Sequence, residues 1–175
     1  MDRPMSNPFF AGMSFIFSVR DWIRPPEKVL EEVDIRPGHN VLDYGCGPGA
    51  FSIAAARRVG KSGKVFALDI HPKAIQMVKE RAAKEGLQNI TTILADRPIG
   101  IEPESIDVVL LFDIFHMLSD AGGVLKGLHG IMKPNSLLSF SDHHMKEEQI
   151  ISRMTAENLF TLKQHGRRTY SFVRN

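Results

Sequence analysis

Cysteine is nearly absent from this sequence. The 175 residues include one cysteine, Cys46, so an internal disulfide cannot form and zinc or iron–sulfur sites built from several cysteines are excluded. An excess of one charge is absent too, because 22 basic and 20 acidic side chains leave a formal net charge of +2. This balance does not indicate a polyanionic partner. The low cysteine content predicts a protein of a reducing compartment.

Long apolar runs are also missing. Residues 9–19 (FFAGMSFIFSV) follow Asp2 and are not followed by a small-residue cleavage site, so they do not match a targeting signal. They are also shorter than the roughly 20 apolar residues of a membrane span. Residues 106–118 are interrupted by acidic residues and a histidine. We therefore expect no membrane span and a soluble, cytoplasmic protein.

Short apolar runs, by contrast, recur along the chain. Five of them are apolar at almost every position, which is typical of strands buried on both faces of a parallel sheet. They cover residues 40–43, 64–69, 91–95, 106–112 and 136–140. Amphipathic segments of helical length lie between them. With 43% apolar residues the chain can fill the core of one domain over residues 1–175.

Helix boundaries are marked by proline, glycine and aspartate. Pro72 suits the first residue of a helix that Gly86 ends, and Asp120 can cap a helix that must end before Pro134. The remaining elements that we expect are a short helix from Pro26, a last helix over 147–158, and two antiparallel strands over 160–164 and 169–173. The fold class predicted is α/β: a doubly wound three-layer α/β/α Rossmann-like sheet of five parallel strands plus a C-terminal antiparallel hairpin.

The sequence VLDYGCGPG, residues 41–49, lies at the turn from the first strand into a helix. Gly45, Gly47 and Gly49 let the backbone turn tightly and approach a ligand closely. Their G-x-G-x-G spacing differs from the G-x-G-x-x-G of dinucleotide sites. Asp43 would repel a pyrophosphate but attract an ammonium group, while the helix N-terminus can face a carboxylate. Together they predict a site for an amino-acid moiety.

Two further aspartates follow strands. Asp69 ends the second strand, where a carboxylate can accept both hydroxyls of a ribose, and Asp96 follows the third, where it can accept from an exocyclic amine such as that of adenine. Ligands of open α/β sheets bind at the carboxyl ends of the strands, where these acids and Asp43 fall. Amino acid, ribose and adenine together describe S-adenosylmethionine.

From about Pro25 to the C-terminus, the chain resembles the class I S-adenosylmethionine-dependent methyltransferases. VLDYGCGPG is similar to the first motif of that family, FALDI to the ribose motif, LAD to the adenine motif and IDVVLLFDIFHML to the fourth-strand motif. KPNSLLSFSDH is similar to the turn and fifth strand, with Asn135 in place of the usual glycine. Asparagine tolerates a left-handed turn, so we expect the turn to persist.

The resemblance implies S-adenosylmethionine as cofactor and S-adenosylhomocysteine as product. It implies that Ile70 packs on the adenine and that Arg97 and Phe112 lie near the cofactor. Tyr44 is left open between touching the cofactor and filling the loop. The predicted cofactor-binding residues are Asp43, Tyr44, Gly45, Gly47, Gly49, Asp69, Ile70, Asp96, Arg97 and Phe112.

The end of the fourth strand bears on the acceptor. It lacks the Asn/Asp-Pro-Pro-aromatic tetrad of methyltransferases acting on nucleobase amines, and its D-x-x-H-x-L ending resembles the small-molecule branch of quinone-biosynthesis type, methyltransferase type 11. We expect in-line methyl transfer to a small apolar or aromatic acceptor. His116 is either a general base or a ring packed beneath the site. His143, after the fifth strand, is a second catalytic candidate.

Asp113 and Asp142, at adjacent strand ends, raise the alternative of a divalent metal held with a histidine, which would serve a vicinal diol acceptor. We predict no metal, because hard, oxygen-preferring cations rarely choose imidazole. The segment around Asp142 is expected instead to line the acceptor pocket or to cap the last helix.

Aromatic residues gather in the first 22 positions, including Phe9, Phe15 and Trp22. We expect residues 1–24 to form an aromatic arm, either a lid over the acceptor or a segment packed on the sheet or on a partner subunit, and residues 25–175 to form the catalytic core. An oligomer could then form through the arm.

Two rival functions remain open. An RNA methyltransferase would use a C-terminal basic cluster, but such a cluster is usually a solvated face, so nucleic acid is not the expected partner. Its members are Lys163, Arg167, Arg168 and Arg174. A non-catalytic cofactor-binding subunit is the second rival, because no single catalytic residue is compelling.

Overall fold

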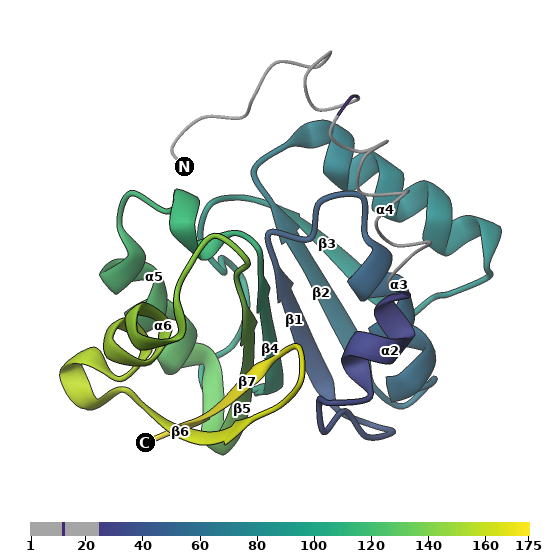
Figure 1. The fold of residues 1–175 in the computed structure, drawn as a ribbon. Coiled ribbons are helices and arrows are strands. Elements are labelled where there is room, and N and C mark those ends of the chain that lie inside the picture. Colours follow the sequence, from purple (N-terminus) through teal and green to yellow (C-terminus); the bar gives the residue numbers. More distant parts are fainter. Residues whose placement is uncertain (1–11, 13–24) are drawn as a thin grey trace.

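One seven-stranded sheet forms the centre of the molecule (Figure 1). The structure is a computed structural model and describes residue 12 and residues 25–175. The strand order is β3-β2-β1-β4-β5-β7-β6, with β7 antiparallel to both of its neighbours and all other pairs parallel. The strands are β1 Asn40–Tyr44, β2 Lys64–Asp69, β3 Ile90–Leu94, β4 Ile106–Phe112, β5 Met132–Ser141, β6 Phe160–His165 and β7 Tyr170–Arg174. The predicted α/β sheet with its C-terminal hairpin is confirmed. The expected aromatic arm lies outside the described residues.

Helices connect most of the parallel strands. They are α2 Pro26–Leu30, α3 Ala50–Val59, α4 Pro72–Lys84, α5 Ala121–Ile131 and α6 Glu147–Met154, with 3-10 turns η1 Phe115–Met117 and η2 Ala156–Asn158. The predicted boundary signals hold: Pro72 opens α4, and the Asp120 side chain accepts a hydrogen bond from Gly123 N–H at the start of α5. Within residue 12 and residues 25–175, no helix combines the length and apolar character needed to cross a bilayer.

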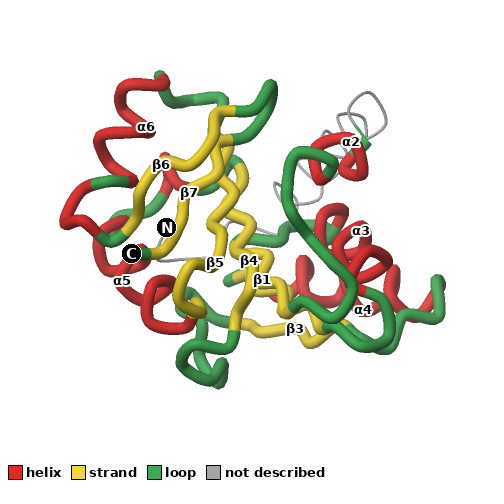
Figure 2. Tube along the Cα trace, turned by 90° about the horizontal axis from the view of Figure 1, so that it is seen from below, coloured by secondary structure: helices red, strands yellow, loops and turns green. Residues whose placement is uncertain are grey.

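The helices cover both faces of the sheet. Figure 2 shows α2, α3 and α4 on one side and α5 and α6 on the other. Leu30 of α2 and Val59 of α3 are fully buried with residues of β1, β2 and β4 in one core cluster, and Leu128 of α5 is buried in the other. A parallel sheet covered on both faces needs apolar side chains at successive positions, which explains the apolar run over residues 108–112 of β4.

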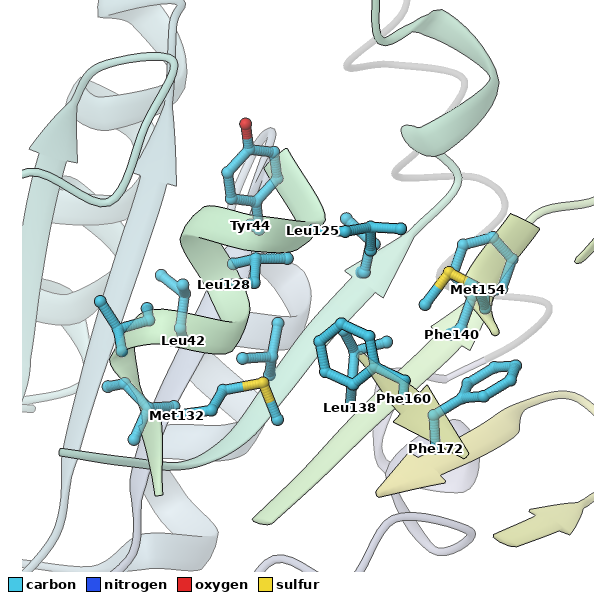
Figure 3. Packing of buried hydrophobic residues seen from close by; sticks show 14 of the residues in the cluster. Leu42, Tyr44, Leu125, Leu128, Met132, Leu138, Phe140, Met154, Phe160 and Phe172 are labelled. Atoms are coloured by element: carbon cyan, nitrogen blue, oxygen red, sulfur yellow. The ribbon is translucent and has the colours of Figure 1, made fainter. Parts of the chain in front are cut away.

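The larger core cluster extends across the C-terminal half of the sheet (Figure 3). It joins Tyr44 of β1 to Leu125 of α5 and continues to Phe140, Phe160 and Phe172 on β5, β6 and β7. The ring of Phe115 in η1 meets Phe140 edge-on, with ring centroids 5.4 Å apart. Because Phe115 is 1% exposed, this contact anchors the short turn that carries His116.

Four expectations need correction. Residues 95–105 join β3 to β4 without a helix, so this strand lacks the helical crossover expected of every strand, and Pro98, Gly100 and Pro103 account for that. The helix expected over 147–158 ends at Met154, because Glu157 and Asn158 have positive φ angles of 61° and 56°. The fifth strand begins four residues early, and β3 is offset by one residue.

Candidate active site

The glycine loop after β1 is held in a left-handed backbone conformation. Gly45, Gly47 and Gly49 have φ angles of 76°, 49° and 85°. A Cβ added at Gly45 would lie 2.9 Å from Ile114 Cγ1, and one at Gly49 would lie 2.6 Å from Val78 Cγ2. A Cβ at Gly47 would meet no atom within 4 Å. Two of the glycines therefore allow close packing, and the third leaves an open backbone surface for a ligand.

The loop is tied to the second strand. Gly45 N–H and Cys46 N–H both donate to Leu68 O, at 2.8 and 2.9 Å. Asp69 Oδ2 accepts from Gly47 N–H at 2.9 Å, and its Oδ1 accepts from His71 N–H at 2.8 Å. Burial raises the pKa of Asp69, against the effect of these hydrogen bonds. Each oxygen keeps a further lone pair, so the predicted ribose contact remains possible while Asp69 also shapes the loop.

Asp43 lies behind the loop and is 3% exposed. Its Oδ2 accepts a hydrogen bond of 2.5 Å from Ser52 Oγ at the start of α3. Burial raises the pKa of Asp43 to about 7, although hydrogen bonds from Ser52 oppose the rise. Near neutral pH this carboxyl is thus only partly ionised. The expected attraction between Asp43 and an ammonium group is weaker than a full negative charge would give.

The ends of β1 and β3 are joined by Tyr44. Its hydroxyl donates to the backbone oxygen of Asp96 at 2.5 Å, and the side chain belongs to the larger core cluster. Burial raises the pKa of Tyr44 to about 12. Tyr44 is therefore built into the core beside the loop, and its contact with a cofactor stays a prediction. Its link to Asp96 was not predicted, because the two residues are 52 positions apart.

The other predicted cofactor residues lie around the same edge. Asp96 and Arg97 are exposed, and Arg97 Nη2 is 3.9 Å from Asp120 Oδ2. Ile70 is partly buried after β2. Phe112, 8% exposed, contacts Phe51 edge-on at a ring-centroid distance of 4.8 Å. The structure thus brings the predicted set to one edge of the sheet, with the ring of Phe112 already packed in the core.

Two aspartate–histidine pairs follow β4 and β5. His116 Nδ1 lies 2.9 Å from Asp142 Oδ2 and 3.0 Å from Oδ1. The carboxyl of Asp142 also accepts from the backbone N–H groups of His116 and His144, at 3.0 and 3.1 Å. Burial acts to raise the pKa of Asp142, but the hydrogen bonds from His116 and His144 outweigh it and leave the pKa below its usual value.

The second pair is more exposed. His143 Nδ1 is 2.8 Å from Asp113 Oδ1, and the two side chains are 64% and 24% exposed. Asp113 adopts a positive φ of 52°. The ring of His144 lies between the two pairs, with centroids 4.2 Å from His116 and 3.9 Å from His143. Sequence reasoning named His116, His143 and Asp142 but not their pairing, and it assigned His144 no role.

The sequence raised Asp113 and Asp142 as metal ligands. In the part of the chain that the structure describes, no group of three or more histidine, cysteine, aspartate or glutamate residues is arranged to hold a metal ion. Each of the two carboxylates instead faces a histidine ring.

Known proteins resemble this chain over most of its length. A sequence profile described as a methyltransferase domain matches residues 35–173. Aklanonic acid methyltransferase DauC of Streptomyces sp. (strain C5) is 34% identical over 105 residues, which cover 59% of this chain and 48% of that protein. Nocamycin O-methyltransferase of Saccharothrix syringae is 31% identical over 126 residues, 69% of this chain and 44% of the other. The chain therefore spans less than half the length of these two relatives.

Solved structures share the fold. A SAM-dependent methyltransferase from Aquifex aeolicus superposes with a TM-score of 0.74 at 23% identity, over 86% of this chain and 88% of that one. The [4+2]-cyclase SpnF superposes with a TM-score of 0.70 at 16% identity, over 81% of this chain and 57% of that one. Because one of these proteins is named a cyclase, the shared fold alone does not assign a reaction.

Proposed function

This chain belongs to the methyltransferase domain family, and on that premise we propose that it transfers the methyl group of S-adenosylmethionine to a small acceptor. The observation that carries the proposal is the glycine loop. Its open backbone at Gly47 is hydrogen-bonded to Asp69, the residue that we predict to accept the ribose hydroxyls. A plain turn needs no such link to a second strand end.

The residues present fit this cofactor. Gly47 leaves space where a side chain would otherwise stand, and both oxygens of Asp69 keep acceptor capacity beyond their backbone hydrogen bonds. Ile70 and the exposed residues Asp96 and Arg97 would surround the adenine. The start of α3 would face the carboxylate of the methionine part. When bound, the cofactor supplies a methyl group already activated by a positively charged sulfur.

The acceptor is proposed to be a small apolar or aromatic molecule. The methyltransferase relatives named above carry names of small-molecule acceptors. So does (S)-coclaurine N-methyltransferase of Thalictrum flavum subsp. glaucum, which is 29% identical over 117 residues that cover 67% of this chain and 32% of that protein. The ends of β4 and β5 would contact the acceptor, with His116 and His143 as candidate bases. The aromatic arm would cover it or bind a second subunit.

The proposal also includes the domain organisation and the cellular compartment. Residues 1–175 act as one domain. The protein works in the cytoplasm, a reducing compartment, which suits a sequence whose single cysteine forms no internal disulfide. Cys46 is buried, and burial raises the pKa of its thiol well above the usual value, so it is not expected to react.

Calorimetric titration of the purified chain tests the function. We expect saturable one-site binding of S-adenosylmethionine and of S-adenosylhomocysteine, and no comparable binding of NAD, since the glycine spacing and Asp43 disfavour a pyrophosphate. Absence of binding by both sulfur ligands, or tighter binding of NAD, would contradict the proposal. Transfer of labelled methyl groups to an acceptor then separates an enzyme from a non-catalytic subunit.

A further inference from the structure

The carboxylate of Asp142 is built into the acceptor side of the site. Its side chain is 0% exposed, and it accepts hydrogen bonds from the His116 ring and from the backbone N–H groups of His116 and His144. These contacts hold the pKa of Asp142 below its usual value in spite of burial. Asp142 is thus a charged acceptor at neutral pH.

A charged carboxylate determines which nitrogen of His116 carries hydrogen. Carboxylate oxygens only accept, so the Nδ1 atom that faces Asp142 must be the donor. In the neutral ring, Nε2 then keeps its lone pair. His116 makes no hydrogen bond through Nε2 to any residue in 25–175, and its side chain is 26% exposed. With respect to the described residues, Nε2 is therefore available to accept a proton.

Packing holds this pair beside the cofactor loop. Phe115, which precedes His116, is buried against Phe140 of β5. Ile114, one residue earlier, packs so closely on Gly45 that a Cβ added to this glycine would lie 2.9 Å from the Cγ1 of Ile114. The segment that carries His116 thus packs directly on the glycine loop. The proton acceptor is thus held beside the loop that is proposed to bind the cofactor.

Resting on the function proposed above, we propose that Asp142 is a positioning residue that fixes His116 as the proton acceptor, and that the methyl acceptor is an ionisable hydroxyl group, a phenol or an enol. The oxygen–carbon bond forms as the sulfur–carbon bond of the donor breaks, and the electron pair of the broken bond stays on sulfur. The hydroxyl proton passes to His116 Nε2 and then to solvent. Asp142 stabilises the positive ring that results.

The His116–Asp142 pair favours hydroxyl acceptors over amines and sulfides. A hydroxyl group is a poor nucleophile until its proton leaves, so a base in place speeds its reaction by about 10²–10⁴-fold. A neutral amine or a sulfide attacks through an existing lone pair and needs no base in the same step. The pair of His143 and Asp113 is less suited to the task, because the His143 side chain is 64% exposed to water.

Nitrogen NMR of the histidine rings tests the positioning role without turnover. In 15N-labelled protein at about pH 8, we expect neutral His116 to carry its proton on Nδ1, with the signal assigned through a His116→Asn variant. Asp142→Asn keeps one oxygen for the backbone N–H groups but presents an amide donor to Nδ1. It should shift the ring towards the Nε2–H form. Asp113→Asn, the matched control, should leave the His116 signals unchanged. A proton on Nε2 in the unchanged protein overturns the proposal.

Three aromatic probes test the acceptor class: 1-naphthol, the more acidic 4-nitro-1-naphthol, and 1-naphthylamine. We expect transfer to 1-naphthol to fall about 100-fold in His116→Asn and at least about 10-fold in Asp142→Asn. The loss should shrink with the nitro compound, which is already ionised. His129→Asn, a surface change, serves as the histidine control.

Each contrary outcome is distinct. Transfer to the amine alone, equal losses on both naphthols, or transfer to none of the three probes overturns the hydroxyl assignment. Failure of the proposed function would appear differently, as absent calorimetric binding of S-adenosylmethionine in the unchanged protein.

Discussion

Asp43 and Asp142 are almost equally buried, at 3% and 5% exposure, yet their pKa values shift in opposite directions. Asp43, on the cofactor side, is desolvated and has only Ser52 to compensate, so its pKa rises to about 7. Asp142, on the acceptor side, receives hydrogen bonds from an imidazole and two backbone N–H groups, which outweigh burial and lower its pKa. Hydrogen bonds oppose the effect of burial at both carboxyls, and only at Asp142 do they outweigh it.

The difference between Asp43 and Asp142 reflects two kinds of site, a cofactor side and an acceptor side, at one edge of the sheet. The cofactor side is shaped by backbone conformation and by carboxyls that support the loop. The acceptor side is shaped by side chains from β4 and β5 that hold a proton in a defined place. Damage to the first should affect cofactor binding, and damage to the second should affect the transfer step while leaving cofactor binding nearly unchanged.

The largest effect is expected at Gly49. Gly49→Ala forces a left-handed alanine, at a φ of 85°, against Val78 Cγ2, which would lie 2.6 Å from the new carbon. Backbone strain and overpacking together should lower the free energy of unfolding by roughly 2–5 kcal/mol. Urea unfolding followed by circular dichroism measures this change.

Gly47→Ala is the matched control, because its Cβ meets no atom within 4 Å. It should cost only about 1–2 kcal/mol of stability. Its affinity for S-adenosylhomocysteine should nevertheless fall, since the new methyl group occupies the open side of the loop. Equal stability of the two variants would contradict the packing assigned to Gly49.

The second effect is a dependence of stability on pH. Because folding raises the pKa of Asp43 from its ordinary value of 3.8 to about 7, its protonated form is favoured in the folded state. The contribution is fully present below about pH 4 and is lost as the pH rises through about 7. It amounts to at most about 4 kcal/mol. Asp69, whose pKa is also raised, adds in the same direction.

Asp43→Asn should flatten that slope, since the amide does not titrate but still accepts from Ser52. Urea unfolding at about pH 5 and about pH 7.5 compares the two proteins. Asp142 acts with the opposite sign and below this window, because its lowered pKa makes stability fall as the pH drops through the acid range. An unchanged slope in Asp43→Asn would show that Asp43 is charged in the folded protein.

The smallest effect is expected at Arg97. Its ion pair with Asp120 spans 3.9 Å between side chains that are 70% and 65% exposed, so Arg97→Ala should change stability by less than about 1 kcal/mol. If Arg97 lies on the cofactor, its removal should still weaken S-adenosylmethionine binding in a calorimetric titration. Unchanged binding would remove Arg97 from the cofactor side of the comparison.

The fold and the cofactor loop were predictable because their signals are local. Runs such as 64–69 and 106–112 match β2 and β4 at both ends, since a strand buried on both faces is apolar at most of its positions. Asn135 has the expected left-handed conformation, with a φ of 60°. The glycines at positions of positive φ in the loop could likewise be recognised from the local sequence.

The acceptor side was less predictable because its contacts join distant residues. His116 and Asp142 are 26 positions apart, and no spacing rule couples a turn after β4 to the end of β5. The sequence therefore predicted Asp142 to line the acceptor pocket or cap a helix, with a metal ligand as the alternative, and left His116 open between a base and a packed ring. Only the parallel pairing of β4 with β5 brings them together.

The most direct measurement is calorimetric binding of S-adenosylhomocysteine to two variants, Asp69→Asn and Asp142→Asn, side by side with the unchanged protein. Replacing one acceptor oxygen of Asp69 by an amide donor should weaken binding to Asp69→Asn about 10-fold or more. Asp142→Asn should bind within about 2-fold of the unchanged protein, because the side-chain hydrogen bonds of Asp142 to residues 25–175 go to His116 and His144 on the acceptor side. Unchanged binding by Asp69→Asn, or lost binding by Asp142→Asn, would contradict the division of the site.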